Sequence, residues 1–407
     1  MKSFQSFTIY QPKRLAVKLS AKGEQYVLKG HPWIFSNSIQ KINKPPETGD
    51  LAVIFRKSGN KFIGIGLYDK DSDIRIKMLY NGSESKQIDA EFFKDQVQKA
   101  YSKRHPLLET DTNSYRLLFG ESDGFPGLIA DVYDKVLVVK FYSGIWFPYF
   151  SDFLDSLIEI TECKTVVLRL SRKLQQSDRH NLNDGMIVYG ELEDEIVVFR
   201  EHGVRFSANV IKGHKTGYFL DHRDNRKRVG EMSRGKTVLD VFSYSGGFSV
   251  HALANGAKEV KSIDISAQAL EVAQFNASLN AHEGKHHTLA GDAFEILNQM
   301  IEQKISYDLV VIDPPSFAKQ QSEVNLAKKK YAQLAKLGAQ LTKANGILVL
   351  ASCSSRVSKD VFVETSLNAI LKTGRTYKII KTTTHDVDHP IGFAEAAYLK
   401  SIYLQLP

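Results

Sequence analysis

Apolar and polar positions alternate over short stretches at the start of the chain. Residues 1–82 contain four such stretches, with Gly and Pro between them: YVLKG (26–30), GDLAVIF (49–55), KFIGIGLY (61–68) and DIRIKMLY (73–80). Short strands at close spacing, separated by turn residues, are typical of a small β-barrel. The turn signal Tyr80-Asn81-Gly82-Ser83 predicts a domain boundary near residue 82.

Helical and strand-like spacing mix between residues 83 and 190. Over 89–105, Phe92, Val97 and Tyr101 fall on one helical face. Strand-like runs follow, with a second helical stretch over 146–160. We therefore predict a small α+β middle domain over 83–190.

Strands and helices alternate regularly over 191–407. Apolar strands such as YDLVVI (307–312) are each followed by a helical stretch. Ser266 is the expected N-cap of one helix and Gly256 the expected C-cap of another. This alternation predicts a third, α/β domain whose parallel sheet carries helices on both faces.

Composition restricts the class of protein. The hydrophobic content of 43% and charged content of 25% are ordinary for a globular protein. No apolar run is long enough to cross a bilayer, and the first residues lack the apolar core of a secretory signal. Cys163 and Cys353 are the only two cysteines, which excludes a disulfide framework and favours a cytoplasmic location. The net charge of +8 mildly favours a polyanionic partner.

A strand, a glycine-bearing turn and a helix follow one another in VLDVFSYSGGFSV. Gly246 and Gly247 allow a ligand to approach the backbone closely, and the next helix offers unsatisfied N–H groups. Asp264 ends the next strand, 24 residues after Asp240, which suits a carboxylate that binds ribose hydroxyls. The G-x-G-x-x-G pattern of dinucleotide enzymes is missing, which disfavours a nicotinamide cofactor and favours S-adenosylmethionine. The alternative is an ordinary αβ unit with a glycine-rich turn.

Two further strands end in residues that carry chemistry. Asp313 is followed by two prolines, which stiffen the turn and suit hydrogen bonding to a flat base. Cys353 ends the apolar run VLAS and has polar neighbours. A lone cysteine at a strand end is often a small core residue, so a structural role is the alternative for Cys353, and it is the role that we expect for Cys163.

The segment HDVDHP contains four residues of metal-binding types: His385, Asp386, Asp388 and His389. One short loop cannot easily enclose a metal ion, so we expect no metal site there.

Six segments in order resemble the ribosomal RNA large subunit methyltransferase I family, class I enzymes that form 5-methylcytosine in 23S rRNA. They are GHPWIFSNSI (30–39), YRLLFGESDGFPGLIADVY (115–133), GHKTGYFLDHRDNR (213–226), FSYSGGFS, IDPPSF and SCSS. The departures are His214, where glutamine is expected, and a divergent stretch over 391–397.

This resemblance implies an RNA-binding PUA-like barrel over 1–82, a middle domain over 83–190 and a Rossmann-like, seven-stranded S-adenosylmethionine-dependent methyltransferase domain over 191–407. It implies a cofactor site made of Asp221, Asp240, Phe242, Ser243, Tyr244, Ser245, Gly246, Gly247, Asp264, Ile265, Asp292, Ala293 and Asp313, with Asp264 on the ribose and Asp292 near the adenine.

For RNA contact we expect Trp33 and Phe35 to stack on bases, Arg75 and Lys77 to contact phosphates, and Lys215 and Arg223 to provide further contacts. Trp33 has the alternative role of a barrel core residue.

Our mechanistic hypothesis gives Cys353 and Asp313 the catalytic roles. A Cys353 thiolate would attack carbon 6 of cytosine, and Asp313 would stabilise the charge that builds up on the base. Two rival hypotheses stay open: an RNA methyltransferase that modifies a guanine nitrogen and has a structural Cys353, and a non-catalytic RNA-binding or ribosome-assembly factor. The sequence permits a homodimer but does not require one.

Overall fold

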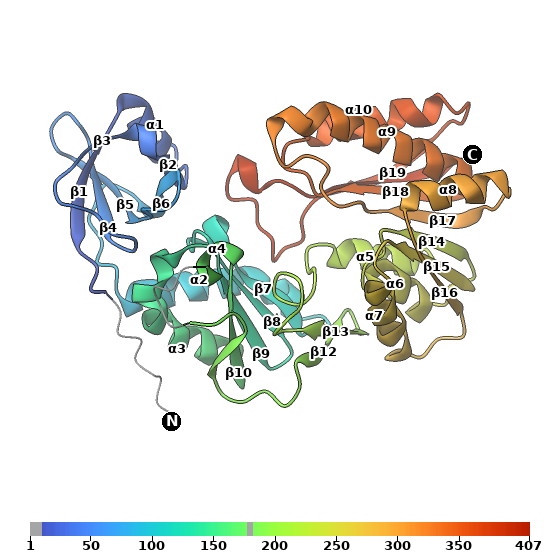
Figure 1. Cartoon of the computed structure of the whole chain (residues 1–407), viewed down its shortest axis with the longest axis horizontal. Coiled ribbons are helices and arrows are strands. Elements are labelled where there is room, and N and C mark those ends of the chain that lie inside the picture. The colour runs from blue at the N-terminus through green and yellow to red at the C-terminus, as the bar shows by residue number, and fades with distance from the viewer. Residues whose placement is uncertain (1–9, 177–181) are drawn as a thin grey trace. The chain divides into compact units, whose positions relative to one another are not determined.

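The computed structural model describes residues 10–176 and 182–407, which form two compact units (Figure 1). The first comprises the chain up to Phe199 together with 208–220 and 387–393. The second comprises 200–207, 221–386 and 394–407. The predicted boundaries near residues 82 and 190 stay predictions.

A six-stranded sheet forms the beginning of the first unit. Its spatial order is β2-β6-β5-β4-β1-β3, and β1 pairs in parallel with β4 and antiparallel with β3. The strands are β1 (Arg14–Leu19), β2 (Trp33–Phe35), β3 (Ile39–Ile42), β4 (Leu51–Phe55), β5 (Phe62–Tyr68) and β6 (Ile74–Asn81). Helix α1 (Ala21–Leu28) begins after Ser20, whose side chain accepts a hydrogen bond from the Gly23 N–H. Three of the four predicted stretches are strands β4, β5 and β6. The prediction of a strand at YVLKG (26–30) is wrong, because residues 26–28 end helix α1.

The rest of the first unit is a five-stranded sheet against two helices. The sheet order is β11-β10-β9-β8-β7, and helices α2 and α3 contribute aromatic side chains such as Phe93 and Phe153 to its core. The elements are α2 (Ala90–Leu108), β7 (Ser114–Phe119), β8 (Leu128–Tyr133), β9 (Val136–Phe141), α3 (Phe150–Thr161), β10 (Thr165–Leu170), α4 (Arg172–Gln175) and β11 (Met186–Tyr189). Two further strands, β12 (Ile196–Glu201) and β13 (Val204–Asn209), form a separate pair.

Buried ion pairs lie next to the five-stranded sheet. Arg104 and Asp123 are both fully buried as side chains and pair at 2.5 Å. Arg116 and Asp131 pair at 2.8 Å. Asp388 is also buried here, where it accepts a hydrogen bond from the Arg116 N–H at 2.9 Å. This residue of the HDVDHP segment therefore serves the packing of the first unit.

The second unit is built on a seven-stranded sheet of order β16-β15-β14-β17-β18-β20-β19. The strands are β14 (Thr237–Val241), β15 (Glu259–Asp264), β16 (Lys285–Ala290), β17 (Tyr307–Ile312), β18 (Thr342–Ser352), β19 (Lys378–Thr383) and β20 (Lys400–Leu406). Strands β14 to β18 are parallel to their neighbours within that group, and β20 is antiparallel to both β18 and β19. The predicted α/β fold is confirmed.

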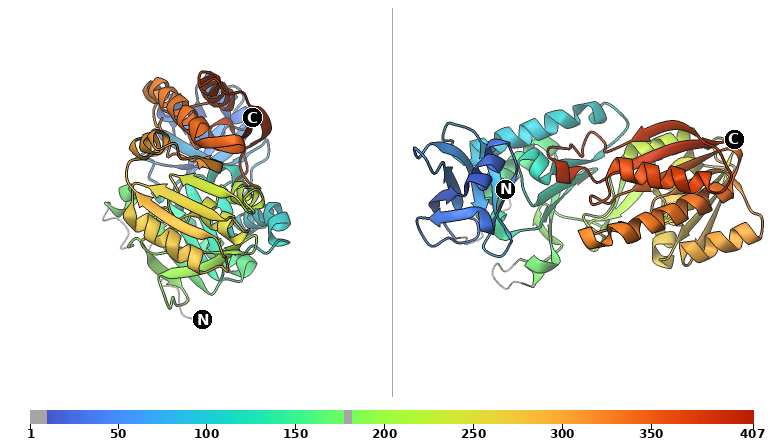
Figure 2. Two further views of the ribbon diagram at one scale, coloured as in Figure 1. Left: turned by 90° about the vertical axis from the view of Figure 1, so that its right-hand side faces the viewer. Right: turned by 90° about the horizontal axis from the view of Figure 1, so that it is seen from above.

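Helices cover both faces of this sheet, as Figures 1 and 2 show. One group is α5 (Arg223–Glu231), α6 (Gly247–Ala254) and α7 (Ala267–Ser278), and the other is α8 (Ala293–Glu302), α9 (Val324–Leu341) and α10 (Lys359–Leu371). The core between sheet and α8–α10 is made of Leu, Ile, Val and Ala side chains. No helix among the described residues is long and apolar enough to cross a membrane.

Candidate active site

The carboxyl ends of β14, β15, β17 and β18 meet at one edge of the seven-stranded sheet. The chain runs from β14 outward to β15 and β16 on one side, and then returns to β17 and β18 on the other. Ligands of open α/β sheets bind in the crevice at such a switch point. The predicted residues Asp240, Asp264, Asp313 and Cys353 all lie at or just beyond these strand ends.

The loop between β14 and α6 has an unusual backbone. Phe242 and Tyr244 have positive φ angles of 64° and 48°, and Gly246 has 78°. A side chain at Gly246 would also place its Cβ 2.8 Å from the Cβ of Ala273, so only glycine fits. Positive φ in residues other than glycine is a strained conformation that is concentrated at functional sites. Two such residues within three positions support a binding role for this loop.

Asp240 is fully buried below the loop. Its Oδ2 accepts hydrogen bonds from the Ser249 N–H at 3.0 Å and the Ser249 hydroxyl at 2.6 Å. Its Oδ1 is buried and has no hydrogen-bond partner among the described residues, and the same holds for the Ser243 hydroxyl. Burial raises the pKa of Asp240 to about 7.

Asp264 and Asp292 organise the neighbouring turns. The Asp264 carboxylate accepts hydrogen bonds from the backbone N–H of Tyr244 and of Ser266, each at 2.9 Å. It therefore joins the end of β15 to the loop after β14. Asp292 caps helix α8 through the N–H groups of residues 294 and 295. Ile265 is 78% exposed beside Asp264, whereas Ala293 is buried.

Asp313 lies beside a histidine that our sequence-based prediction missed. His222 Nε2 is 3.3 Å from Asp313 Oδ2, and the ring is buried against Phe248. Burial opposes the charged form, but the carboxylates of Asp313 and Asp221 more than offset it, so the pKa of His222 is raised. Asp221, in turn, accepts a hydrogen bond from the Tyr398 hydroxyl at 2.8 Å. The signal was available in the sequence, because Asp221 and His222 are adjacent in a segment already assigned to the site.

Cys353 is half-buried directly after β18. Its thiol lies 3.8 Å from the carbonyl oxygen of Pro314, which places it beside the D-P-P turn. The polar neighbours point away from it: the Ser352 hydroxyl donates to Tyr331 at 2.8 Å, and the Ser354 hydroxyl donates to a backbone carbonyl at 3.1 Å. The structure thus brings the two predicted catalytic residues onto adjacent strand ends, whereas Cys163 is buried in the first unit.

Lys400 is a second residue that the sequence did not reveal. It begins β20, pairs in register with Ser352, and is 3% exposed. Its ammonium group donates to the carbonyl oxygens of Ser354, Val357 at 2.6 Å and Tyr398 at 3.1 Å. Burial lowers the pKa of Lys400 to about 8, while the charge of Cys353 acts to raise it. Among the residues described, no carboxylate forms an ion pair with this cation.

Two of the residues predicted to contact RNA are interior. Lys77 is 6% exposed and pairs with Asp69 at 2.7 Å. The Arg223 side chain is fully buried, and its guanidinium lies 3.4 Å from Asp386. Buried cations held by carboxylates are not available to phosphate groups, so we remove both from the expected RNA surface.

The other four residues with a predicted RNA role differ in exposure. Trp33 is half-buried, and its indole N–H donates to Glu121 at 2.9 Å, which leaves it closer to the packing alternative. Arg75 is half-buried, with its guanidinium over the Tyr68 ring. Phe35 and Lys215 are exposed. Their contact with RNA stays a prediction.

Comparison with known proteins identifies the chemistry of this edge. Residues 116–374 match the family described as S-adenosylmethionine-dependent methyltransferase, and residues 17–81 match a PUA-like domain. A protein from Deinococcus radiodurans named ribosomal RNA large subunit methyltransferase is 42% identical over 97% of this chain and 98% of its own. One from Tolumonas auensis named ribosomal RNA large subunit methyltransferase I is 34% identical over 96% and 98%. The chain belongs to the ribosomal RNA large subunit methyltransferase I family.

Solved structures of methyltransferases share the fold. A crystal structure with S-adenosylhomocysteine bound matches with a TM-score of 0.79 at 20% identity, over 97% of this chain and 100% of the other. A second, from Streptococcus mutans, matches with a TM-score of 0.78 at 20% identity, over 96% and 99%. These structures show the shared fold, while the family match and the named relatives confirm the predicted family and cofactor.

The residues of this methyltransferase edge fit S-adenosylmethionine. The cofactor carries an ammonium group and a sulfonium cation, and Asp240 presents a buried carboxylate oxygen without a partner. The ribose offers hydroxyl donors, and Asp264 is a half-buried carboxylate at the end of β15. Exposed Ile265 adds an apolar surface of the kind that an adenine ring covers.

Proposed function

We propose that this methyltransferase forms 5-methylcytosine in 23S rRNA, with Cys353 as a covalent nucleophile. The proposal rests on one observation above all: a cysteine at the end of β18 adjoins the Asp313 turn and lies beside the buried cation Lys400. The names of the relatives support rRNA of the large subunit as the substrate.

The cofactor, when bound, supplies an electrophilic methyl group. In our proposal Asp240 holds its positively charged amino acid part, Asp264 binds its ribose, and the loop after β14 encloses it. The strained backbone at Phe242 and Tyr244 fixes that loop before binding, so little conformational freedom is lost when the cofactor binds.

Carbon 5 of cytosine is a poor nucleophile until carbon 6 is attacked. The Cys353 sulfur forms a bond to carbon 6, and the electron pair of the carbon 5–carbon 6 double bond moves to carbon 5, which takes the methyl group. A base then removes the carbon 5 proton, the double bond re-forms, and the sulfur–carbon bond breaks. Every bond made to Cys353 is thus broken within one turnover.

Asp313 and Lys400 have separate roles in this proposal. The Asp313 carboxyl group accepts a hydrogen bond from the exocyclic amine of the base and, when it carries a proton, donates one to the ring nitrogen, and so stabilises the negative charge that develops there. His222 holds that carboxylate in place. Lys400 favours the thiolate, because the attraction between a cation and a thiolate in a water-poor site acts equally on both partners.

The proposal is tested by mass spectrometry of nucleosides from unmodified 23S rRNA incubated with the protein and S-adenosylmethionine. We expect 5-methylcytosine to appear with the parent protein and with Cys163→Ala, and to be lost with Cys353→Ala. A methylated guanine formed equally by all three proteins would contradict the covalent role and favour nitrogen methylation. Absence of methylation on both naked rRNA and the large subunit would favour a binding factor.

A further inference from the structure

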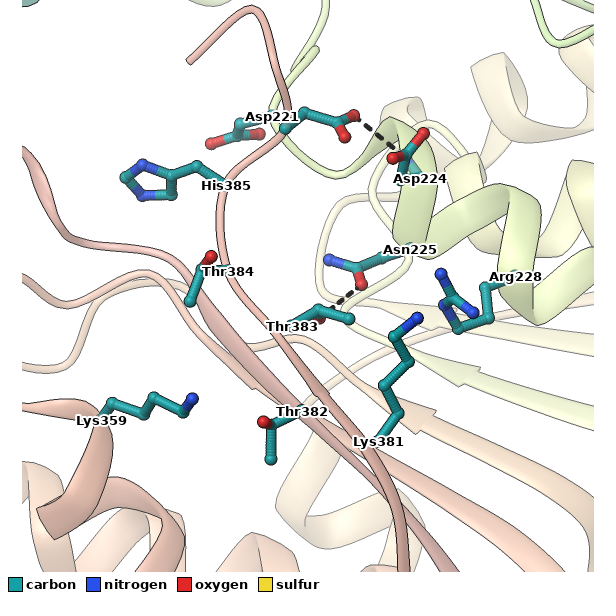
Figure 3. Close-up of a pocket in the computed structure, with 11 residues that line it drawn as sticks. Asp221, Asp224, Asn225, Arg228, Lys359, Lys381, Thr382, Thr383, Thr384 and His385 are labelled. Carbon is teal, nitrogen blue, oxygen red and sulfur yellow. Dashed lines mark hydrogen bonds between the residues drawn. The ribbon is translucent and has the colours of Figure 1, made fainter. Parts of the chain in front are cut away.

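A polar pocket of about 310 Å³ lies in the second unit, and Asp221 is the one predicted cofactor residue that lines it. Its walls come from α5, from the start of α10, and from β19 with the residues that follow it (Figure 3). Three consecutive threonines, Thr382 to Thr384, supply hydroxyl groups to one wall. Neither the cofactor residues of the β14 loop nor Cys353 lines this pocket.

Three cations line the pocket: Arg228, Lys359 and Lys381. In Figure 3, Arg228 and Lys381 enter from one side and Lys359 from the other. Within residues 10–176 and 182–407, none of the three forms an ion pair, and the buried Nε of Arg228 has no hydrogen-bond partner. Both lysines are exposed.

The carboxylates of the pocket are engaged elsewhere. Asp386 lies beside Arg223 and accepts the Asp224 N–H at 3.1 Å. Asp224 itself is hydrogen-bonded to His202 at 3.1 Å. Asp221 accepts the Tyr398 hydroxyl, as described above. Because these carboxylates already accept hydrogen bonds and the three cations form no ion pair among the described residues, the pocket offers its free donors to an anion.

The pocket is close to the catalytic strand end. Thr383, the last residue of β19, pairs with Ser401 of β20, which pairs with Ala351 of β18. Adjacent strands lie about 4.8 Å apart, so Thr383 is roughly 10 Å from Ala351, two residues before Cys353. The backbone of a nucleotide that flanks the target base covers such a distance.

We propose that this pocket binds a backbone phosphate of the substrate RNA next to the nucleotide that is methylated. Lys359 and Lys381 neutralise the phosphodiester, and the Arg228 guanidinium donates paired hydrogen bonds. The hydroxyls of Thr382 and Thr384 donate to the remaining oxygens, whereas the Thr383 hydroxyl already donates to Asn225 at 2.7 Å. Such contacts position the strand without reading its sequence. The assignment of the polyanion to RNA rests on the proposed function, whereas the anion site rests on the geometry above.

The experiment measures binding of a fluorescent fragment of unmodified 23S rRNA by anisotropy, without cofactor. The test variant is Lys359→Ala/Lys381→Ala. Its matched control is Lys372→Ala/Lys378→Ala, which removes the same charge from exposed positions at the far ends of α10 and β19. We expect affinity to fall about tenfold or more in the test variant and less than twofold in the control. The salt dependence, as the slope of log K against log salt, should decrease by about 0.7 for each lost contact to single-stranded RNA.

Equal losses in both variants, no loss in the test variant, or no binding of RNA by the parent protein would overturn the phosphate site. Calorimetry with S-adenosylhomocysteine should give the same affinity for all three proteins. The two proposals fail separately. A parent protein that forms no methylated nucleoside but loses RNA affinity only in the test variant contradicts the proposed reaction alone. Methylation with the same KM for RNA in test and control contradicts the pocket alone.

Discussion

Arg104 in the first unit and Lys400 in the second are both buried cations, but only one has a counter-charge. Arg104 pairs with the equally buried Asp123 at 2.5 Å. Lys400 is 3% exposed and, among the described residues, donates to backbone carbonyl groups alone: those of Ser354 and Val357 after Cys353, and that of Tyr398. Asp240, at the same edge, has one buried carboxylate oxygen that accepts no hydrogen bond from any described residue.

Burial of an unpaired charge costs several kcal/mol, so such a group persists where it serves another purpose. The second unit also pairs its buried charges away from this edge: the guanidinium of Arg226 is 2.6 Å from Glu201, which in turn lies 2.8 Å from His251. The lack of a counter-charge is therefore a feature of the strand ends in the second unit, and not of the second unit as a whole. We infer that the unmatched buried charges Lys400 and Asp240 belong to the catalytic edge. The scaffold pairs its buried charges or, at Asp50 of the first unit, satisfies the carboxylate with hydrogen bonds from the Tyr10 hydroxyl and two backbone N–H groups.

The largest expected effect is on stability, in the first unit. Arg104→Met leaves Asp123 buried without its main partner, and we expect the free energy of unfolding to fall by about 3–5 kcal/mol. Urea denaturation measures this change. The double variant Arg104→Met/Asp123→Leu should recover part of it, because no unpaired charge remains. A loss below about 1 kcal/mol in the single variant would remove the contrast between the two regions.

In contrast to Arg104→Met, Asp240→Asn should not lower the free energy of unfolding above pH 7. The folded carboxyl has a pKa of about 7, raised from 3.8, so its ionisation disfavours the folded state as pH rises toward 7. Without ligand, the variant should be at least as stable as the parent above pH 7. The carboxylate that binds a cationic cofactor forms only as pH rises through about 7, so parent affinity for S-adenosylhomocysteine should increase about tenfold between pH 5.5 and 8.5. Calorimetry should show that the affinity of Asp240→Asn for S-adenosylhomocysteine does not change with pH. An equal rise in affinity with pH in both proteins would contradict a role of the Asp240 carboxylate in cofactor binding.

The smallest expected effect is that of Lys400→Met. This variant should slow the reaction of the Cys353 thiol and should change how the free energy of unfolding depends on pH. The folded pKa of about 8 lies below the ordinary 10.5, so the parent gains stability as pH rises from about 8 to 10.5. The variant lacks this pH dependence, so its free energy of unfolding should exceed that of the parent by the largest amount below pH 8. Loss of the cation should slow alkylation of Cys353 by iodoacetamide about tenfold at pH 7.5, measured by peptide mapping. An unchanged rate in a folded variant would refute the activating role of Lys400.

The sequence predicted the parts of the site that are local. The turn after β14 needs glycine at a position with positive φ, and Gly246 provides the signal directly. The ends of β17 and β18 followed from apolar runs that stop at Asp313 and Cys353. Helix α2 followed from the helical spacing of Phe92, Val97 and Tyr101, and the structure adds its cap, the Asp89 side chain, which accepts the Phe92 N–H at 3.0 Å.

The features that spacing could not show depend on how the chain folds back on itself. Lys77 and Arg223 looked like surface cations because spacing does not show that Asp69, eight residues before Lys77, and Asp386, 163 residues after Arg223, neutralise them inside the fold. Lys400 stands in an apolar strand 47 residues after Cys353, and only the antiparallel register of β20 brings it to that turn. Patterns of spacing carry no information on such pairings.

The covalent role of Cys353 is tested most directly with RNA transcribed with 5-fluorocytidine. Fluorine on carbon 5 cannot leave as a proton, so after methyl transfer the base stays bonded to the attacking sulfur. We predict an adduct that survives denaturing electrophoresis, requires S-adenosylmethionine, maps to Cys353, and forms with Cys163→Ala but not with Cys353→Ala. Formation of 5-methylcytosine on ordinary RNA without any such adduct, or an adduct at another residue, would contradict the account.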